Sequence, residues 1–104
     1  FLNNYVEGNL GSPVITVSDL CNSVDFDNNY FGMSPTANPT YLIYSEGVNT
    51  MIHGNIFSQQ QNTYDVYMFK GSAYIYNNVF AMGSSKLFSN CSGRVYDNTF
   101  GDND

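Results

Sequence analysis

The stretch "AYIYNNVF", residues 73–80, places two adjacent asparagines inside a run of residue types that favour β-strands, although asparagine itself is depleted there. Similar stretches recur as "FLNNYV" from Phe1, "FDNNYF" from Phe26, "IHGNIF" from Ile52 and "VYDNTF" from Val95. Each has a large apolar residue, any residue, then Asn, Asp or Gly, an unvarying Asn, any residue and a final apolar residue. The pattern therefore marks an internal repeat.

The unvarying residue of this repeat recurs at intervals of 20 to 26 positions, as Asn4, Asn29, Asn55, Asn78 and Asn98. A period in the twenties is typical of a solenoid, in which each repeat buries its apolar face only by stacking on the next. The length of 104 residues predicts a single domain over positions 1–104. Abundant Tyr and Phe, without a window of helical periodicity, predict an all-β chain.

Alternation along the repeat predicts which side chains face the interior. In "AYIYNNVF", the two-residue period of a strand points Ala73 and Ile75 inward and Tyr74 and Tyr76 outward, with Phe80 inward after the bend. A second strand is predicted upstream in each of four repeats. Its sequences are "VITV" from Val14, "YLIY" from Tyr41, "DVYMF" from Asp65 and "KLF" from Lys86.

Stacking of the repeats gives the recurring asparagine a structural role. A sharp bend between strands needs the left-handed backbone region, which Gly and Asn tolerate best. Equivalent residues of stacked strands lie about 4.8 Å apart, so inward amides can hydrogen-bond to their equivalents above and below. We therefore predict an internal ladder of asparagines, formed by Asn4, Asn29, Asn55, Asn78 and Asn98.

The apolar positions on either side of the bend predict two further ladders in the core. The first lies three residues before the recurring asparagine, at Phe26, Ile52, Ile75 and Val95. The second lies two residues after it, at Phe31, Phe57, Phe80 and Phe100.

The stretches "IYNNVF", "VYDNTF" and "FDNNYF" resemble the repeat of the right-handed parallel β-helix. This repeat is shared by pectate-lyase-like proteins, periplasmic copper-processing proteins and adhesin-like surface proteins of methanogenic archaea and bacteria. Residues 26–43, "FDNNYFGMSPTANPTYLI", further resemble a segment of the adhesin-like members. The resemblance implies a solenoid of about four to five coils, with an Asn ladder at the tight turn between two of its three sheets.

The charge of the chain excludes some partners. The formal net charge is −6, and the permanent cations are Lys70, Lys86 and Arg94. Without a basic patch we expect no binding to nucleic acid or to an anionic membrane surface, and the lack of a long apolar run predicts no membrane insertion. Low Lys with abundant Asn, Tyr and Ser favours an extracellular or cell-surface location. The sequence "NCS" at Asn90 also matches a glycosylation acceptor.

The two cysteines do not predict an internal disulfide. Cys21 and Cys91 are about three repeats apart, roughly 14 Å along the stack, whereas bridged Cα atoms lie within about 7 Å. We interpret both as small apolar residues near turns.

Candidate catalytic groups are sparse. The stretch "DFDNN" from Asp25 begins like a calcium loop, but Tyr30 and Thr36 stand where that loop needs glycine and an acid. Lyases and hydrolases of the related fold cluster several acids with a basic residue, whereas His53 and Arg94 here lie on different repeats. We therefore predict no catalysis, no metal and no cofactor.

An outward stripe is the best candidate interaction surface. Asp27, His53, Tyr76 and Tyr96 all stand two positions before the recurring asparagine, and Tyr74 lies beside them. The surface predicted from His53, Tyr74, Tyr76 and Tyr96 would present rings suited to sugars or to another subunit. The alternative is that these rings pair across strands only to stabilise the sheet.

These features favour a non-catalytic, extracellular structural or adhesive β-helix. No capping helix is evident, so we expect either a part of a longer surface solenoid or a subunit that stacks head to tail into a fibre. In the fibre, residues 1–6 of one copy would continue the ladder of residues 95–100 of the next. The alternative is a fragment of a carbohydrate-active β-helix enzyme, a polysaccharide lyase or glycoside hydrolase, or a sugar-binding β-helix.

Overall fold

The computed structural model describes residues 1–6, 15–32, 41–47, 49–58, 64–68, 71–83 and 92–103. Within these ranges the chain forms strands and no helix. The strands are β1 (Tyr5–Val6), β2 (Ile15–Val17), β3 (Ser23–Asp27), β4 (Tyr30–Gly32), β5 (Tyr41–Ser45), β6 (Asn49–His53), β7 (Ile56–Ser58), β8 (Tyr64–Met68), β9 (Ser72–Tyr76), β10 (Val79–Gly83), β11 (Ser92–Tyr96) and β12 (Thr99–Asn103).

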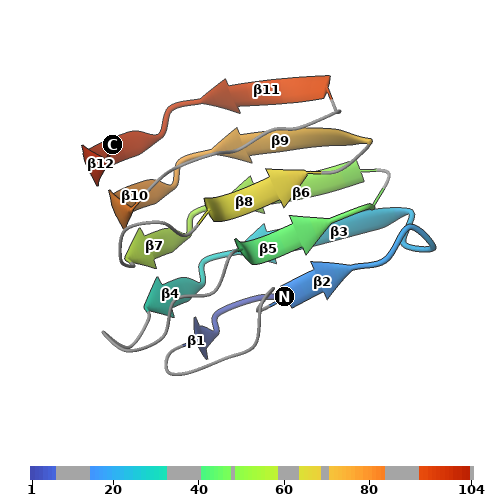
Figure 1. Ribbon diagram of the computed structural model, residues 1–104, viewed down its shortest axis with the longest axis horizontal. Coiled ribbons are helices and arrows are strands. Elements are labelled where there is room, and N and C mark those ends of the chain that lie inside the picture. Colours follow the sequence, from blue (N-terminus) through green and yellow to red (C-terminus); the bar gives the residue numbers. More distant parts are fainter. Residues whose placement is uncertain are drawn as a thin grey trace.

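The strands form three sheets, and within each sheet every pair of neighbouring strands is parallel. The five-stranded sheet has the order β1-β4-β7-β10-β12, the four-stranded sheet β11-β9-β6-β3 and the three-stranded sheet β2-β5-β8. Consecutive strands such as β5, β6 and β7 therefore belong to different sheets, and neighbours within a sheet come from successive repeats. Figure 1 shows this stacking, with the first strands at one end and β11 and β12 at the other.

This arrangement confirms the prediction of an all-β chain with parallel sheets and is consistent with a parallel solenoid. We call the strands that one repeat contributes to the sheets a level. Of the predicted upstream strands, three are present as β2, β5 and β8. The fourth, "KLF" from Lys86, lies outside the described residues.

The register of the five-stranded sheet aligns four phenylalanines. Phe31, Phe57, Phe80 and Phe100 face one another on β4, β7, β10 and β12. Their neighbouring rings stack with centroids 4.9 to 5.1 Å apart. Phe31, Phe57 and Phe80 are fully buried, whereas Phe100 is 49% exposed. The exposure follows from position, because β12 is an edge strand with a neighbour on one side only.

The four-stranded sheet aligns the other apolar row in the same way. Phe26 faces Ile52, Ile52 faces Ile75, and Ile75 faces Val95. The first three are buried, and Val95 is 38% exposed on the edge strand β11. Both predicted ladders are thus in register, but the level formed by β11 and β12 leaves its apolar side chains partly open to solvent.

The three-stranded sheet contributes further side chains to the same core. Its buried side chains include Val17 on β2, Ile43 on β5, and Val66 and Met68 on β8. One buried polar pair joins this sheet to the four-stranded sheet: the hydroxyls of Ser45 on β5 and Thr50 on β6 lie 3.0 Å apart. Because each hydroxyl has a partner, the pair avoids the cost of an unsatisfied buried polar group.

Candidate functional site

The bend between the four-stranded and five-stranded sheets is built by two residues with different conformations. The residue before the recurring asparagine has a positive φ, from 53° at Asp97 to 68° at Gly54. The recurring asparagine itself does not. The sequence predicted a residue in the left-handed backbone region at this turn, but it did not show which of the two positions adopts it. The structure places it on the first residue and leaves the second free to turn its side chain inward.

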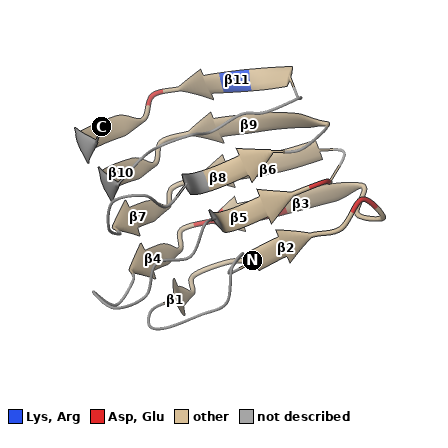
Figure 2. Cartoon of the chain, in the orientation of Figure 1, with Lys and Arg blue, Asp and Glu red and all other residues tan. Residues whose placement is uncertain are grey.

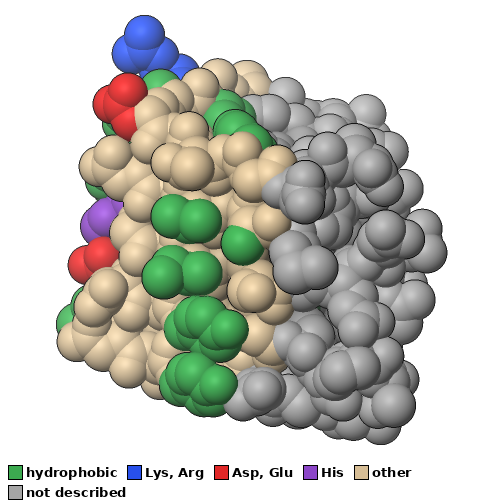
Figure 3. All heavy atoms as spheres, turned by 90° about the vertical axis from the view of Figure 1, so that its left-hand side faces the viewer, with side chains coloured by type: hydrophobic (Ala, Val, Ile, Leu, Met, Phe, Trp, Pro, Cys, Tyr) green, Lys and Arg blue, Asp and Glu red, His purple; other side chains and the backbone are tan. Residues whose placement is uncertain are grey.

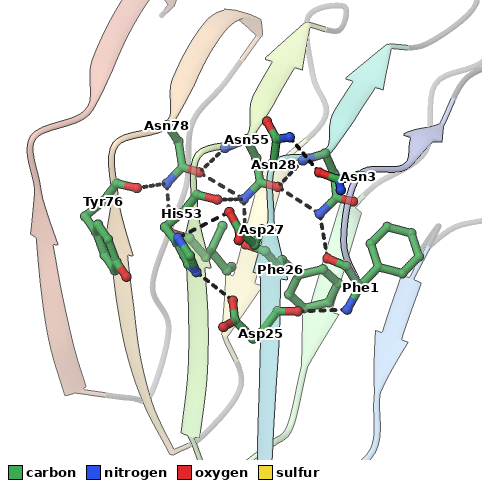
Figure 4. A network of polar contacts seen from close by, with 12 residues as sticks. Phe1, Asn3, Asp25, Phe26, Asp27, Asn28, His53, Asn55, Tyr76 and Asn78 are labelled. Atoms are coloured by element: carbon green, nitrogen blue, oxygen red, sulfur yellow. Dashed lines mark hydrogen bonds and ion pairs between the residues drawn. The ribbon is translucent and has the colours of Figure 1, made fainter.

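The recurring asparagines form a continuous hydrogen-bonded ladder inside this bend (Figure 4). In each step, the side-chain oxygen of one asparagine accepts two hydrogen bonds from the asparagine of the preceding level. The backbone N–H of Asn29 donates to Asn55 Oδ1 at 2.8 Å, and Asn29 Nδ2 donates to the same oxygen at 2.9 Å. The same pair of bonds joins Asn55 to Asn78, Asn78 to Asn98, and Asn4 to Asn29.

Each amide nitrogen in the ladder also bonds to the backbone. Asn55 Nδ2 donates to the carbonyl oxygens of Phe26 at 2.9 Å and His53 at 3.0 Å. Asn29, Asn55 and Asn78 are at most 2% exposed. Burying an amide without partners would cost free energy, so these bonds are what make a polar residue acceptable in the core.

The ladder has a direction, and its two ends differ. Among the described residues, Asn4 Oδ1 at the first level accepts no hydrogen bond, although each later asparagine oxygen accepts two. At the last level, the backbone N–H of Asn98 donates none within the described part of the chain. Within the described residues, every bond of the ladder therefore runs from the asparagine of one level to the side-chain oxygen of the asparagine of the next level.

The predicted outward surface lies on the outer face of the four-stranded sheet, in two separate rows. His53, Tyr76 and Tyr96 form one row, with neighbouring rings stacked 4.9 and 5.0 Å apart and nearly parallel. Tyr74 lies in the other row, in register with Met51 and Arg94. Because the rings of the first row cover each other's faces, they present edges to solvent. His53 and Tyr96, at the two ends of this row, each have a second face that no other ring of the row covers.

Two carboxylates hold the imidazole of His53, an arrangement that the sequence did not predict (Figure 4). His53 Nε2 lies 2.8 Å from Asp25 Oδ1, and His53 Nδ1 lies 3.4 Å from Asp27 Oδ1. Asp25 and Asp27 are two residues apart on β3 and so share its outer face, and the pairing of β3 with β6 sets Asp27 opposite His53. That alternation, combined with alignment of the asparagines, is the signal that could have predicted the cluster.

This cluster links two levels but does not form an acid–base pair aimed at an open cleft. Both imidazole nitrogens face carboxylates, and the side chains of Asp25 and Asp27 are 56% and 42% exposed. Exposed contacts of this kind, even when both partners are charged, contribute only about 0–1 kcal/mol to stability. Within the described residues, no group of three or more His, Cys, Asp or Glu side chains could hold a metal ion.

The surroundings of Tyr76 on this face raise its pKa. Desolvation raises the pKa of its phenol above the ordinary value of 10.0, and the nearby Tyr96, Asp25 and Asp27 raise that pKa further because each disfavours a phenolate. Arg94 is the basic residue of the described region, and Figure 2 shows it on β11, away from the acidic residues of β3. Lys70, Lys86, Asn90 and Cys91 lie outside the described residues, and Cys21 is a free, half-buried thiol.

A second outward surface lies on the five-stranded sheet and was not predicted. Figure 3 shows a column of hydrophobic side chains there, formed by Tyr5, Tyr30, Ile56 and Val79. Tyr5 and Tyr30 stack with ring centroids 4.9 Å apart. Beside this column, at the bend, is a shallow hollow of about 280 Å³ lined mainly by asparagine and tyrosine side chains. The signal in the sequence is the residue directly after each recurring asparagine, which is apolar or Tyr in these four repeats.

Fold and site together define the class: an all-β chain whose repeats stack in three parallel sheets around a buried asparagine ladder. No family model, curated protein or solved structure matches the chain. No helix in the described residues is long and apolar enough to span a membrane.

Proposed function

We propose that the chain is a right-handed parallel β-helix that serves as a non-catalytic structural or adhesive module outside the cell or on its surface. The observation that supports this best is the continuity of the asparagine ladder and the two apolar ladders through successive levels. These ladders use the inward side chains of each repeat for stability. The repeat thus builds a rigid rod, as its resemblance to adhesin-like surface proteins implies.

The geometry gives little support to the alternative of a carbohydrate-active enzyme. Asp25 and Asp27 both contact His53, so the acids closest to a histidine are already engaged. Arg94 lies on β11, which is separated from β6 and His53 by β9. Two strand spacings amount to about 9.6 Å, so one bound sugar could not contact Arg94 and His53 with the close geometry that acid–base catalysis requires.

A purely sugar-binding role on the His53 row is also weaker than the structural role. Stacking on a sugar needs an open ring face, and the faces of Tyr76 are covered by His53 and Tyr96. The pairing of these rings therefore favours the alternative in which cross-strand aromatic contacts stabilise the sheet.

An activity assay on acidic polysaccharides tests the proposal against the enzyme alternative. The wild-type chain is compared with Asp25→Asn and Arg94→Gln, and each variant is checked for an unchanged circular dichroism spectrum. We expect no turnover from any of the three. Turnover that either substitution abolishes would overturn the non-catalytic assignment. Antibody labelling of intact and permeabilised cells tests the location, and labelling only after permeabilisation would contradict it.

A further inference from the structure

Pairs of stacked tyrosine rings join neighbouring levels on all three sheets. The two rings of each pair have centroids 4.9 to 5.6 Å apart and planes within 7° of parallel. Their residues lie directly opposite each other on adjacent parallel strands, so each phenol has an identical group beside it. The pairs are Tyr5–Tyr30, Tyr44–Tyr67 and Tyr76–Tyr96. In the core the same stacking is made by phenylalanine, which has no hydroxyl to oxidise.

The pair Tyr76–Tyr96 on the four-stranded sheet is open to an oxidant in solution. Tyr76 has the ring of His53 on one face and that of Tyr96 on the other, yet it is only half-buried. Its ring edge, which carries the hydroxyl and the ortho carbons, is therefore reached from solvent even though both faces are covered. Tyr96 is 42% exposed. The chain contains no tryptophan, so tyrosine is its most readily oxidised ring.

We propose that Tyr76 and Tyr96 are a site of oxidative coupling, at which β9 and β11 become joined covalently. The oxidant is hydrogen peroxide used by a haem peroxidase. Each phenol loses one electron and one proton and becomes a phenoxyl radical, whose unpaired electron is shared between the oxygen and the ortho carbons. The radicals form a carbon–carbon bond between one ortho carbon of each ring, and the hydrogen on each of these carbons moves to the oxygen to restore the phenol. The two electrons and two protons reduce one peroxide molecule to two water molecules.

The stack favours coupling within one molecule over coupling between molecules. Strand pairing holds the two rings with centroids 5.0 Å apart, which converts an encounter of two phenols into a step within one chain. Because both ring edges reach solvent, the side chains can rotate out of the stack and bring their ortho carbons together. The new bond would close a loop between positions 76 and 96 and, like a disulfide, restrict the unfolded chain.

This inference rests on the proposed structural function outside the cell and names a modification of the rod. An extracellular location supplies the oxidising surroundings in which covalent cross-links are used to stabilise proteins. The cysteines at positions 21 and 91 lie on distant repeats and are not expected to form an internal disulfide. Coupling of Tyr76 and Tyr96 would supply the covalent brace that the cysteines do not.

Substitutions at the two outward tyrosines of β9 and at the residue opposite one of them give a matched test. Tyr76→Phe keeps the stacked ring and removes the phenol. Tyr74→Phe removes a phenol from the same strand and face, where the neighbours in register are Met51 and Arg94. Arg94→Tyr, at an exposed position, sets a tyrosine opposite Tyr74 and tests whether register alone creates a coupling site. Circular dichroism establishes that each variant keeps the fold.

Each protein is treated at high dilution with a haem peroxidase and hydrogen peroxide, and intact mass and peptide mapping then locate the cross-links. We expect the wild type to lose two hydrogen atoms for each link without doubling its mass, and to link positions 76 and 96. The link between positions 74 and 96 should be at least about tenfold rarer, because these residues are out of register. In Tyr76→Phe, Tyr96 should not couple to Tyr74 instead, whereas Arg94→Tyr should gain a link between positions 74 and 94. After treatment, the Tm of the wild type should exceed that of Tyr76→Phe by about 10 °C.

Three results would overturn the inference. They are cross-links formed mainly between molecules, coupling of Tyr74 in the wild type at a yield similar to that of Tyr76, and no new link in Arg94→Tyr. Any of these results would leave the structural role of the rod intact. Polysaccharide turnover by the untreated wild type would instead refute the proposed function while leaving the coupling site in place.

Discussion

Replacing Phe80 with alanine tests whether the phenylalanine row supports the stack. Phe80 is fully buried, and its ring lies between those of Phe57 and Phe100, with centroids 4.9 and 5.1 Å away. Truncation removes apolar contacts on both ring faces and leaves a cavity that the parallel strands on either side cannot easily close. We therefore expect the free energy of unfolding to fall by about 3–5 kcal/mol. For a domain of this size, whose total stability is about 5–15 kcal/mol, that is a large fraction.

Phe100→Ala is the matched control, because it deletes the same atoms from the same row. Phe100 is 49% exposed and its truncation opens onto solvent without enclosing a cavity, so the expected loss is about 1–2 kcal/mol. Urea unfolding followed by circular dichroism, at a concentration where the chain is monomeric, measures both losses. Equal losses at the two positions, or a loss at Phe80 below about 1 kcal/mol, would refute the ladder as the source of stability.

Three further changes test the bend and the outer face. Asn55→Leu removes the side-chain oxygen that accepts two hydrogen bonds and the amide that donates to two carbonyls. We therefore expect urea unfolding to show that the free energy of unfolding falls by about 3 kcal/mol or more. Asn49→Ala, at an exposed position, is the control and should lower it by less than about 1 kcal/mol. Gly54 has a φ of 68°, in the left-handed region that Asn tolerates better than Ala. Gly54→Ala should therefore lower the free energy of unfolding by about 1–2 kcal/mol, and Gly54→Asn should lower it clearly less. Equal decreases in Tm for the two variants would contradict this expectation. The raised pKa of Tyr76 means that its contribution to stability is complete below pH 10 and is lost as the pH rises through the folded pKa. Tyr76→Phe should therefore weaken the alkaline loss of stability, and an unchanged profile in pH-dependent unfolding would count against the assignment.

The sequence was sufficient to predict the parallel strands, because a polar residue recurring inside strand-like stretches also fixes the register. Aligning Asn29, Asn55 and Asn78 sets Phe31 opposite Phe57 and Phe57 opposite Phe80, as the structure has them. The turn was less predictable. Both residues of an Asn-Asn pair tolerate the left-handed region, so composition alone could not show that the first one adopts it.

The outer face was harder to predict, because its chemistry depends on ring orientation and rotamer. Alternation placed His53 and Tyr76 outward, but it could not show that neighbouring rings would cover both faces of Tyr76. Likewise, alignment set Asp27 opposite His53, yet the 2.8 Å contact is made by Asp25, which lies diagonally across the strands. Exposure at Val95 and Phe100 follows from the lack of a described neighbour beyond them, which a repeat pattern does not encode.

The difference between the inner and outer rows indicates where this chain can make a repeated contact. At the inner positions each level presents nearly the same chemistry, asparagine at the bend and an apolar side chain before and after it. On the outer face the row changes from Asp27 to His53 to two tyrosines, so a polymer lying along the stack would meet a different group at each level. The row that contains His53 therefore suits at most one local contact, whereas a contact that must recur from level to level is better served by the apolar column of Tyr5, Tyr30, Ile56 and Val79 on the five-stranded sheet.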